Sequence, residues 1–171
     1  TLETNLLGAF VITKCAVASM IATGSGSIIH FSGGGAAHGR PNFSAYAASK
    51  AGLLRLVETV AQELALAGYT DVIINAIAPG GVRTAMTDEV LRHAERAGAA
   101  EAAAAAEVRQ SGGTPPTLIV SLVDFLCDRS SNKGVSGRLF HVKDDYARFA
   151  SQGDGGELPE DAGRLRRIPL P

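Results

Sequence analysis

The chain has 171 residues and a net charge of −1, with 46% apolar and 19% charged residues. This size suits one domain with a buried core, and the balanced charge argues against nucleic-acid binding through phosphate neutralisation. No apolar run looks long enough for a membrane span and no basic leader opens the sequence, so we expect no membrane association and a cytoplasmic location. Cys15 and Cys127 match neither a zinc site nor a disulfide framework, and we expect both to be small core residues.

Apolar residues at helical intervals predict a helix over residues 1–23 that ends near Gly24. The first residue, Thr1, already lies inside this helix, with no preceding cap or lead-in segment. A chain that begins within an element is expected to be part of something longer.

Two buried strands with glycine-rich exits follow. A β-branched run over residues 27–32 predicts the first strand, which leaves through glycines 33–35. A long helix is expected over 44–67, and a second apolar strand over 71–78 is broken by Pro-Gly-Gly at 79–81.

The remaining chain predicts helices over 87–110 and 118–128 and a third strand over 135–142. We therefore expect a domain over residues 1–145 and a polar tail over 146–171. A basic cluster marks the tail: Arg164, Arg166 and Arg167.

Strands separated by helices predict an α/β fold with a parallel sheet covered on both faces, which is a three-layer αβα arrangement. Ligands bind such sheets beyond the carboxyl ends of the strands. Both glycine-rich exits fall at this edge, where glycine lets a ligand approach the backbone closely.

Tyr46 and Lys50 are the most informative pair in the chain, because four-residue spacing puts both side chains on one face of the expected helix. A free phenol, with a pKa of about 10, is a poor proton donor or acceptor at neutral pH. A fixed positive charge nearby favours the phenolate and makes proton exchange with an alcohol or carbonyl oxygen feasible. A surface helix that carries an unrelated tyrosine and lysine is the alternative.

Three motifs in order make the sequence resemble the short-chain dehydrogenase/reductase family over about residues 1–142. They are Asn5-Leu6-Leu7-Gly8, Tyr46-Ala47-Ala48-Ser49-Lys50 and Asn75-Ala76-Ile77-Ala78-Pro79-Gly80-Gly81-Val82-Arg83-Thr84. The resemblance implies a Rossmann-like fold and hydride transfer between NAD or NADP and a small carbonyl or alcohol substrate.

By the same resemblance, Tyr46 is the general acid or base, and Lys50 favours its phenolate form and bonds the nicotinamide ribose. Asn5 would hold a water in a proton relay. The turn after the second strand would grip the nicotinamide, which makes Pro79, Gly80, Val82 and Thr84 cofactor-binding candidates together with Tyr46 and Lys50. The family also implies a homodimer or tetramer built through helices 1–23 and 44–67.

The serine that binds the substrate oxygen is displaced from the family pattern. It usually lies thirteen residues before the tyrosine, where this chain has Gly33. Ser32 is fourteen before, and we expect the loop from 34 to 43 to absorb the difference, although strand alternation argues against a one-residue slip. Ser44 is a second candidate for this role, and the alternative is that it caps the helix that begins there.

The family's N-terminal half, with its pyrophosphate-binding glycine turn, has no counterpart here, so we expect a fragment that binds cofactor weakly and is weak or inactive alone. A non-catalytic dimerisation module derived from the family is the alternative function. The segment 85–114 takes the place of the family's substrate lid or forms an ordinary surface helix. His38 and Arg83 are candidates for substrate or phosphate contact or are simply solvated, and His30 is expected to be a packed core histidine.

Overall fold

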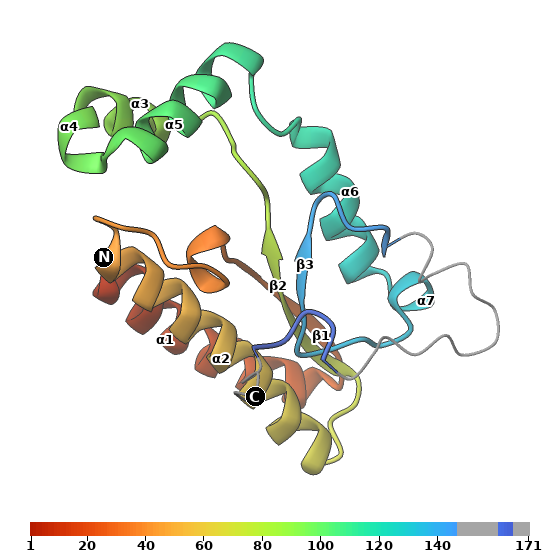
Figure 1. The fold of residues 1–171 in the computed structure, drawn as a ribbon. Helices are drawn as coiled ribbons and strands as arrows, with labels where there is room; N and C mark the ends of the chain where they lie inside the picture. Colours follow the sequence, from red (N-terminus) through yellow and green to blue (C-terminus); the bar gives the residue numbers. More distant parts are fainter. Residues whose placement is uncertain (147–160, 166–171) are drawn as a thin grey trace, which may run out of the picture.

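Three parallel strands form the centre of the fold, in the order β1-β2-β3 (Figure 1). They cover Gly26–Phe31 (β1), Val72–Ala78 (β2) and Leu139–His141 (β3). This computed structural model describes residues 1–146 and 161–165. Every residue of β2 is buried, as expected for an apolar strand with a neighbour on each side.

The helices include a short π-helical turn at the start of the chain and a 3-10 turn after β1. Their bounds are η1 Glu3–Leu7, α1 Gly8–Thr23, η2 Gly34–Ala36, α2 Ser44–Leu66, α3 Ala85–Arg92, α4 Ala94–Ala97, α5 Ala99–Ser111, α6 Pro116–Cys127 and α7 Arg129–Asn132. Helix α1 ends where Gly24 takes a left-handed conformation at φ 89°.

The sheet separates two apolar cores, which gives the expected three layers and confirms the α/β prediction. Helices α1 and α2 cover one face, and α6 covers the other (Figure 1). Leu54 and Val57 of α2 pack with Ile74 of β2 in the first core. Leu122 and Phe125 of α6 pack in the second core, with β2 and β3.

Two predicted elements differ from the structure. The helix expected over 87–110 is three helices, interrupted at His93 and at Gly98, whose φ of 89° breaks helical geometry. The third strand is confined to Leu139–His141, because the positions before it include Gly137 at φ 73°, which leaves the extended conformation. Helix α7 was not predicted.

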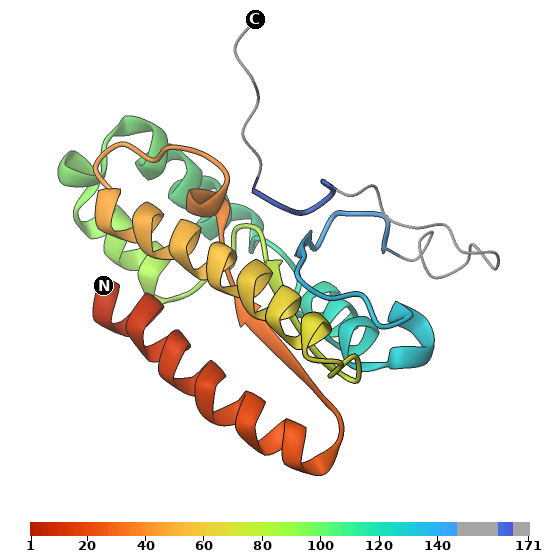
Figure 2. The ribbon, with the colours of Figure 1, turned by 90° about the horizontal axis from the view of Figure 1, so that it is seen from below.

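The outer face of α1 is uncovered within the described chain, and Figure 2 shows the helix at the periphery beside α2. Phe10, Val11 and Ile12 are between half and two-thirds exposed, and Thr13 is the only buried residue of the helix. Cys15 is exposed here, and so is Cys127 at the end of α6, which corrects the expectation of two core cysteines.

Contrary to the expectation from the sequence, the helical stretch Glu3–Thr23 is long and apolar enough to cross a membrane, by length and composition alone. These two properties do not separate a membrane span from a helix that another protein surface covers. In the described structure the helix packs on β1 and α2.

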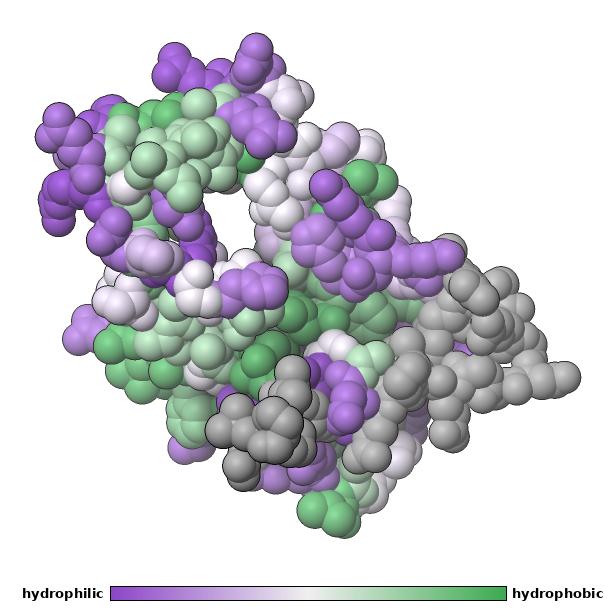
Figure 3. All heavy atoms as spheres, viewed as in Figure 1, coloured by the Kyte–Doolittle hydropathy of each residue, from purple (hydrophilic) through white to green (hydrophobic). Residues whose placement is uncertain are grey.

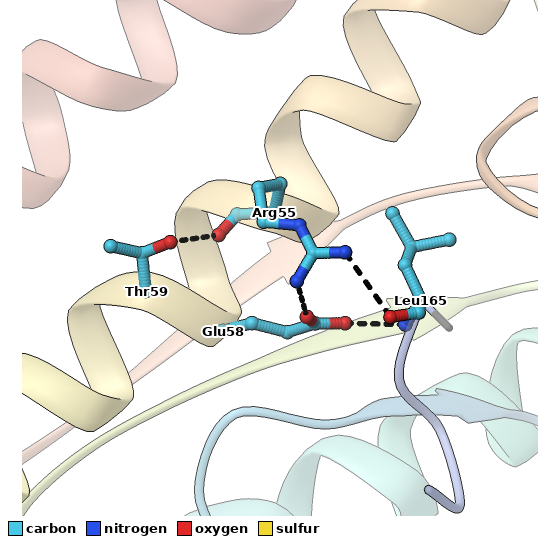
Figure 4. Close-up of polar contacts among 4 residues, drawn as sticks. All are labelled: Arg55, Glu58, Thr59 and Leu165. Carbon is cyan, nitrogen blue, oxygen red and sulfur yellow. Dashed lines mark hydrogen bonds and ion pairs between the residues drawn. The ribbon is translucent and has the colours of Figure 1, made fainter. Parts of the chain in front are cut away.

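Residues 161–165 of the expected tail lie against α2 and β3. The buried carboxylate of Glu58 accepts the backbone N–H of Leu165 at 2.6 Å and pairs with Arg55, which donates to the Leu165 carbonyl at 3.1 Å (Figure 4). The backbone N–H of Leu139 donates to the Gly163 carbonyl at 2.8 Å. Arg164 belongs to the described residues, whereas Arg166 and Arg167 lie outside them.

Candidate functional site

A cleft of about 560 Å³ opens at the carboxyl ends of β1 and β2, beside helices α3 and α5. Figure 3 shows the molecule hollowed between the α3–α5 helices and the N-terminal part of α2. The predicted site residues that line this cleft are Asn5, Ser32, Tyr46, Lys50, Pro79, Gly80, Val82 and Thr84. The fold therefore brings all of these candidates to one place.

Tyr46 and Lys50 share one face of α2 and turn toward the end of β1. The Lys50 ammonium nitrogen lies 5.8 Å from the centre of the Tyr46 ring and donates to the Phe31 carbonyl at 2.7 Å. Burial lowers the pKa of Lys50. A half-buried ammonium beside a phenol is the arrangement that the four-residue spacing predicted.

Ser32 and Gly33 follow β1 directly and occupy different positions around the phenol. The side chain of Ser32 is buried, lines the cleft, and its hydroxyl oxygen has no hydrogen-bond partner among the described residues. Gly33 faces the phenol itself: a β-carbon there would lie 2.5 Å from the Tyr46 hydroxyl. The residue thirteen before the tyrosine is thus the one that faces it, while Ser32 keeps an unsatisfied hydroxyl in the same cleft.

Asn5 lies in the π-helical turn η1, and its side-chain amide donates to the Ser49 hydroxyl at 3.2 Å. Ser49 in turn donates to the Tyr46 carbonyl at 2.7 Å, so a chain of hydrogen bonds joins η1 to α2. Isolated π-helical turns often mark functional sites. Nothing in the sequence pattern distinguished this turn from ordinary α-helix.

The turn after β2 forms the opposite wall of the cleft. Gly80 has a φ of 72°, and a β-carbon there would lie 2.6 Å from the Thr114 hydroxyl, so the position requires glycine. The Thr87 hydroxyl donates to the Val82 carbonyl at 2.9 Å and accepts from the Thr84 N–H at 3.3 Å. These contacts hold the turn against the start of α3.

An ion pair that the sequence did not reveal spans the cleft. Arg40, in the loop between β1 and α2, donates from Nε to Glu101 of α5 at 2.8 Å, and its Nη2 contacts the second carboxylate oxygen. The hydrogen bond from Arg40 is the main cause of the lowered pKa of Glu101, and the same bond raises the pKa of Arg40, with a smaller contribution from Tyr46. The guanidinium lies 5.2 Å from the centre of the Tyr46 ring.

Three weaker candidates are not among the residues that line the cleft. His38, Arg83 and Ser44 are exposed and do not line it, and Phe43 rather than Ser44 occupies the cap position of α2.

His30 on β1 is partly buried, which agrees with its expected structural role. Its Nε2 lies 2.8 Å from the Thr13 hydroxyl, which donates its own proton to the Ala9 carbonyl, so we assign the histidine as the donor. Burial and, secondarily, the charge of Lys50 lower the pKa of His30.

The cleft fits one end of a dinucleotide. The unpartnered hydroxyl of Ser32 and the ammonium of Lys50 offer donors to the oxygen atoms of such a ligand. The sequence contains no Gly-x-Gly-x-x-Gly motif for a pyrophosphate.

Comparison with known proteins agrees with this geometry. A family model described as short chain dehydrogenase matches residues 1–95. A 3-oxoacyl-[acyl-carrier-protein] reductase from Synechocystis sp. is 38% identical over 89 residues, which are 52% of this chain and 35% of the reductase.

Solved structures give the same picture. A protein described as an NAD(P)-dependent gluconate 5-dehydrogenase from Beutenbergia cavernae, with bound NADP, aligns with a TM-score of 0.67 and 33% identity over 88% of this chain and 56% of its own. Carveol dehydrogenase from Mycobacterium avium, in complex with NAD, aligns with a TM-score of 0.66 and 26% identity over 82% of this chain and 53% of its own.

The chain therefore spans between about a third and just over half of the length of these relatives. The family model covers more than half of the 171 residues, including the tyrosine and lysine of α2. The resemblance inferred from the motifs is confirmed, and the chain belongs to the short-chain dehydrogenase family.

Proposed function

We propose that this chain carries the proton-transfer half of an NAD(P)-dependent oxidoreductase site, with Tyr46 as general acid or base. The observation that carries this proposal is the placement of Tyr46, Lys50 and the unpartnered Ser32 hydroxyl in one cleft at the carboxyl edge of the sheet. Relatives described as reductases and dehydrogenases, two of them with NAD or NADP bound, support the same reaction class.

In the reducing direction, Tyr46 gives its hydroxyl proton to the substrate oxygen as the carbonyl carbon accepts a hydride. The bound nicotinamide supplies that hydride, or accepts it in the reverse reaction. The ammonium of Lys50 stabilises the negative charge left on the phenol oxygen. Asn5, which is linked to α2 through Ser49, would hold a water in the relay that returns the proton from solvent through Lys50.

Ser32 is our candidate for the donor that holds the substrate oxygen. A buried hydroxyl without a partner is destabilising in the free protein, and such groups are commonly retained at ligand sites. Gly33 then leaves the space in front of the phenol open for that oxygen.

The cofactor-binding residues in this proposal are Tyr46, Lys50, Pro79, Gly80, Val82 and Thr84. Residues other than these six decide whether NAD or NADP binds and which carbonyl compound is the substrate.

The test is a hydride-transfer assay on these 171 residues extended by an upstream glycine-rich βαβ segment, with Tyr46→Phe as the matched variant. Nicotinamide absorbance should change with wild-type Tyr46 and stay within the uncatalysed rate with Tyr46→Phe, since phenylalanine keeps the ring and removes the proton. Full activity of Tyr46→Phe would refute the proposed role.

A second candidate function, a non-catalytic interaction module, is favoured by one observation: the exposed apolar face of α1. Such a face suits pairing with another copy or with a longer homologue. Replacing Phe10 by serine should abolish self-association in a light-scattering measurement, whereas Leu118→Ser on α6 should not. A monomeric wild type would contradict this function and also the homo-oligomer that the family resemblance implies.

A further inference from the structure

Among the described residues, three charged side chains line the cleft: Lys50, Arg40 and Glu101. Lys50 is bound to the Phe31 carbonyl and has a place in the proposed proton transfer. Arg40 and Glu101 come from opposite walls of the cleft, the loop after β1 and helix α5, and the proposed hydride transfer uses neither.

Two aromatic rings hold the Arg40 guanidinium beside the reacting phenol. Its central carbon lies 4.9 Å from the centre of the Phe43 ring and 5.2 Å from the centre of the Tyr46 ring. Stacking on rings fixes the plane of a guanidinium and leaves its N–H groups free to bind in that plane. In the described structure these N–H groups bind the carboxylate of Glu101 with both oxygens.

On the side of the α3–α5 helices, the described side chains around this ion pair offer no second cation, and the Thr87 hydroxyl that lines the cleft there is already bonded to Val82 and Thr84. The side chains that approach the cleft from there are mostly apolar: Met86, Val90, Ala104, Ala105 and Val108. A ligand group with a negative charge would therefore find one cationic partner on this side, next to Tyr46.

We propose, on the basis of the function proposed above, that Arg40 binds the carboxylate of a short oxo or hydroxy acid and that Glu101 fills the same place in the free protein. Arginine and carboxylate match in a two-bond geometry, so a ligand carboxylate can repeat the bonds that Glu101 makes. The Arg40 and Glu101 side chains are 27% and 20% exposed, so a ligand in the cleft can reach the ion pair, and its carboxylate would replace one two-bond partner of Arg40 by another of the same kind.

The closeness of Arg40 to Tyr46 limits the length of the substrate. The reacting oxygen would lie at the Tyr46 hydroxyl and the carboxylate at a guanidinium whose central carbon is 5.2 Å from the centre of the same ring. This closeness favours acids with few carbon atoms between the two groups, such as 2- or 3-oxo acids and the matching hydroxy acids.

The test is calorimetric titration of the 171-residue chain with 3-hydroxybutanoate and with its uncharged methyl ester. Wild-type protein should bind the acid about tenfold or more tightly than the ester, as expected for charge-assisted hydrogen bonds. Arg40→Met should remove this preference, and Glu101→Gln should strengthen acid binding by removing the competing carboxylate. Arg109→Met, at an exposed position of the same α5 helix, should change neither the affinity for the acid nor the affinity for the ester.

Equal binding of acid and ester by the wild type, no binding of the acid, or a preference that survives in Arg40→Met would each overturn this inference. Glu101→Gln keeps the test decisive if Arg40→Met fails to fold. Tyr46→Phe separates the two proposals, because it abolishes hydride transfer while leaving the preference for the acid in place.

Discussion

A β-carbon on Gly33 would lie 2.5 Å from the hydroxyl oxygen of Tyr46, closer than real side chains approach. Gly33→Ala should therefore push the phenol from its position without disturbing the backbone, since Gly33 is extended at φ 173°. We expect hydride transfer to fall by about a hundredfold, because misplacing a reacting group by roughly 1 Å costs this much. Steady-state kinetics of the extended protein measures the change.

Gly34→Ala is the matched control, because a β-carbon at that neighbouring glycine meets nothing within 4 Å. Its rate should stay near that of the wild type. Equal rates for the two variants would mean that the phenol is not confined by Gly33.

Ser32→Ala should separate catalysis from stability. The buried Ser32 hydroxyl has no partner in the described structure, so removing it costs the fold no hydrogen bond. We expect the free energy of unfolding to stay equal or to rise by up to about 1 kcal/mol, while hydride transfer falls by about a hundredfold through loss of the donor to the substrate oxygen. Ser32→Thr, which keeps a hydroxyl, should retain part of the rate.

Denaturant unfolding and kinetics on the same preparations measure both effects. A large loss of stability in Ser32→Ala, with an unchanged rate, would assign the hydroxyl a structural role only.

Strand β2 and helix α2 could be predicted from the sequence because the local order of apolar and polar residues determines them. The β-branched run Val72–Ala78 is buried on both sides, and the tyrosine and lysine share a helix face wherever the helix lies. The exposure of Cys15 could not be read in this way, because α1 is apolar on its outer face as well.

Most features that could not be predicted from the sequence are contacts between residues far apart in the chain. Arg40 and Glu101 are 61 positions apart, and Asn5 and Ser49 are 44 apart. Neither pair has a spacing signal, since the loop after β1 and helix α5 meet only through the arrangement of the whole sheet. Gly98, whose φ of 89° breaks the long helix, stands in an alanine-rich run that favours helix on both sides.

His30 should make stability depend on pH. Burial and the charge of Lys50 lower its folded-state pKa, so the unfolded chain takes up a proton first as the pH falls below about 6.5. The free energy of unfolding is therefore highest above that pH and decreases as the pH falls toward the folded-state pKa. His30→Gln removes this titration and should flatten the curve in that window.

Denaturant midpoints measured from neutral to mildly acidic pH test the effect. His38→Gln, at an exposed loop position, should keep the wild-type slope. A slope that persists in His30→Gln would assign it to another group.

Glu58 joins helix α2 to residues 161–165 (Figure 4), and its side chain is 1% exposed. It pairs with Arg55 at 2.5 Å and accepts the Leu165 N–H at 2.6 Å, so Glu58→Gln removes the charge from both contacts while keeping the shape. We expect a loss of about 1.5–3 kcal/mol in the free energy of unfolding, the range for hydrogen bonds to a charged group. Glu63→Gln, exposed on the same helix, should change it by less than about 0.5 kcal/mol.

Amide hydrogen exchange shows where the loss falls. The Leu165 N–H should exchange faster in Glu58→Gln, and so should the Leu139 N–H, which donates to Gly163 in the same segment. Amides of β2, buried in the centre of the sheet, should lose only the protection that corresponds to the change in the free energy of global unfolding. If Leu165 kept its wild-type exchange rate, Glu58 would stabilise α2 alone, and the contact with residues 161–165 would contribute nothing to the fold.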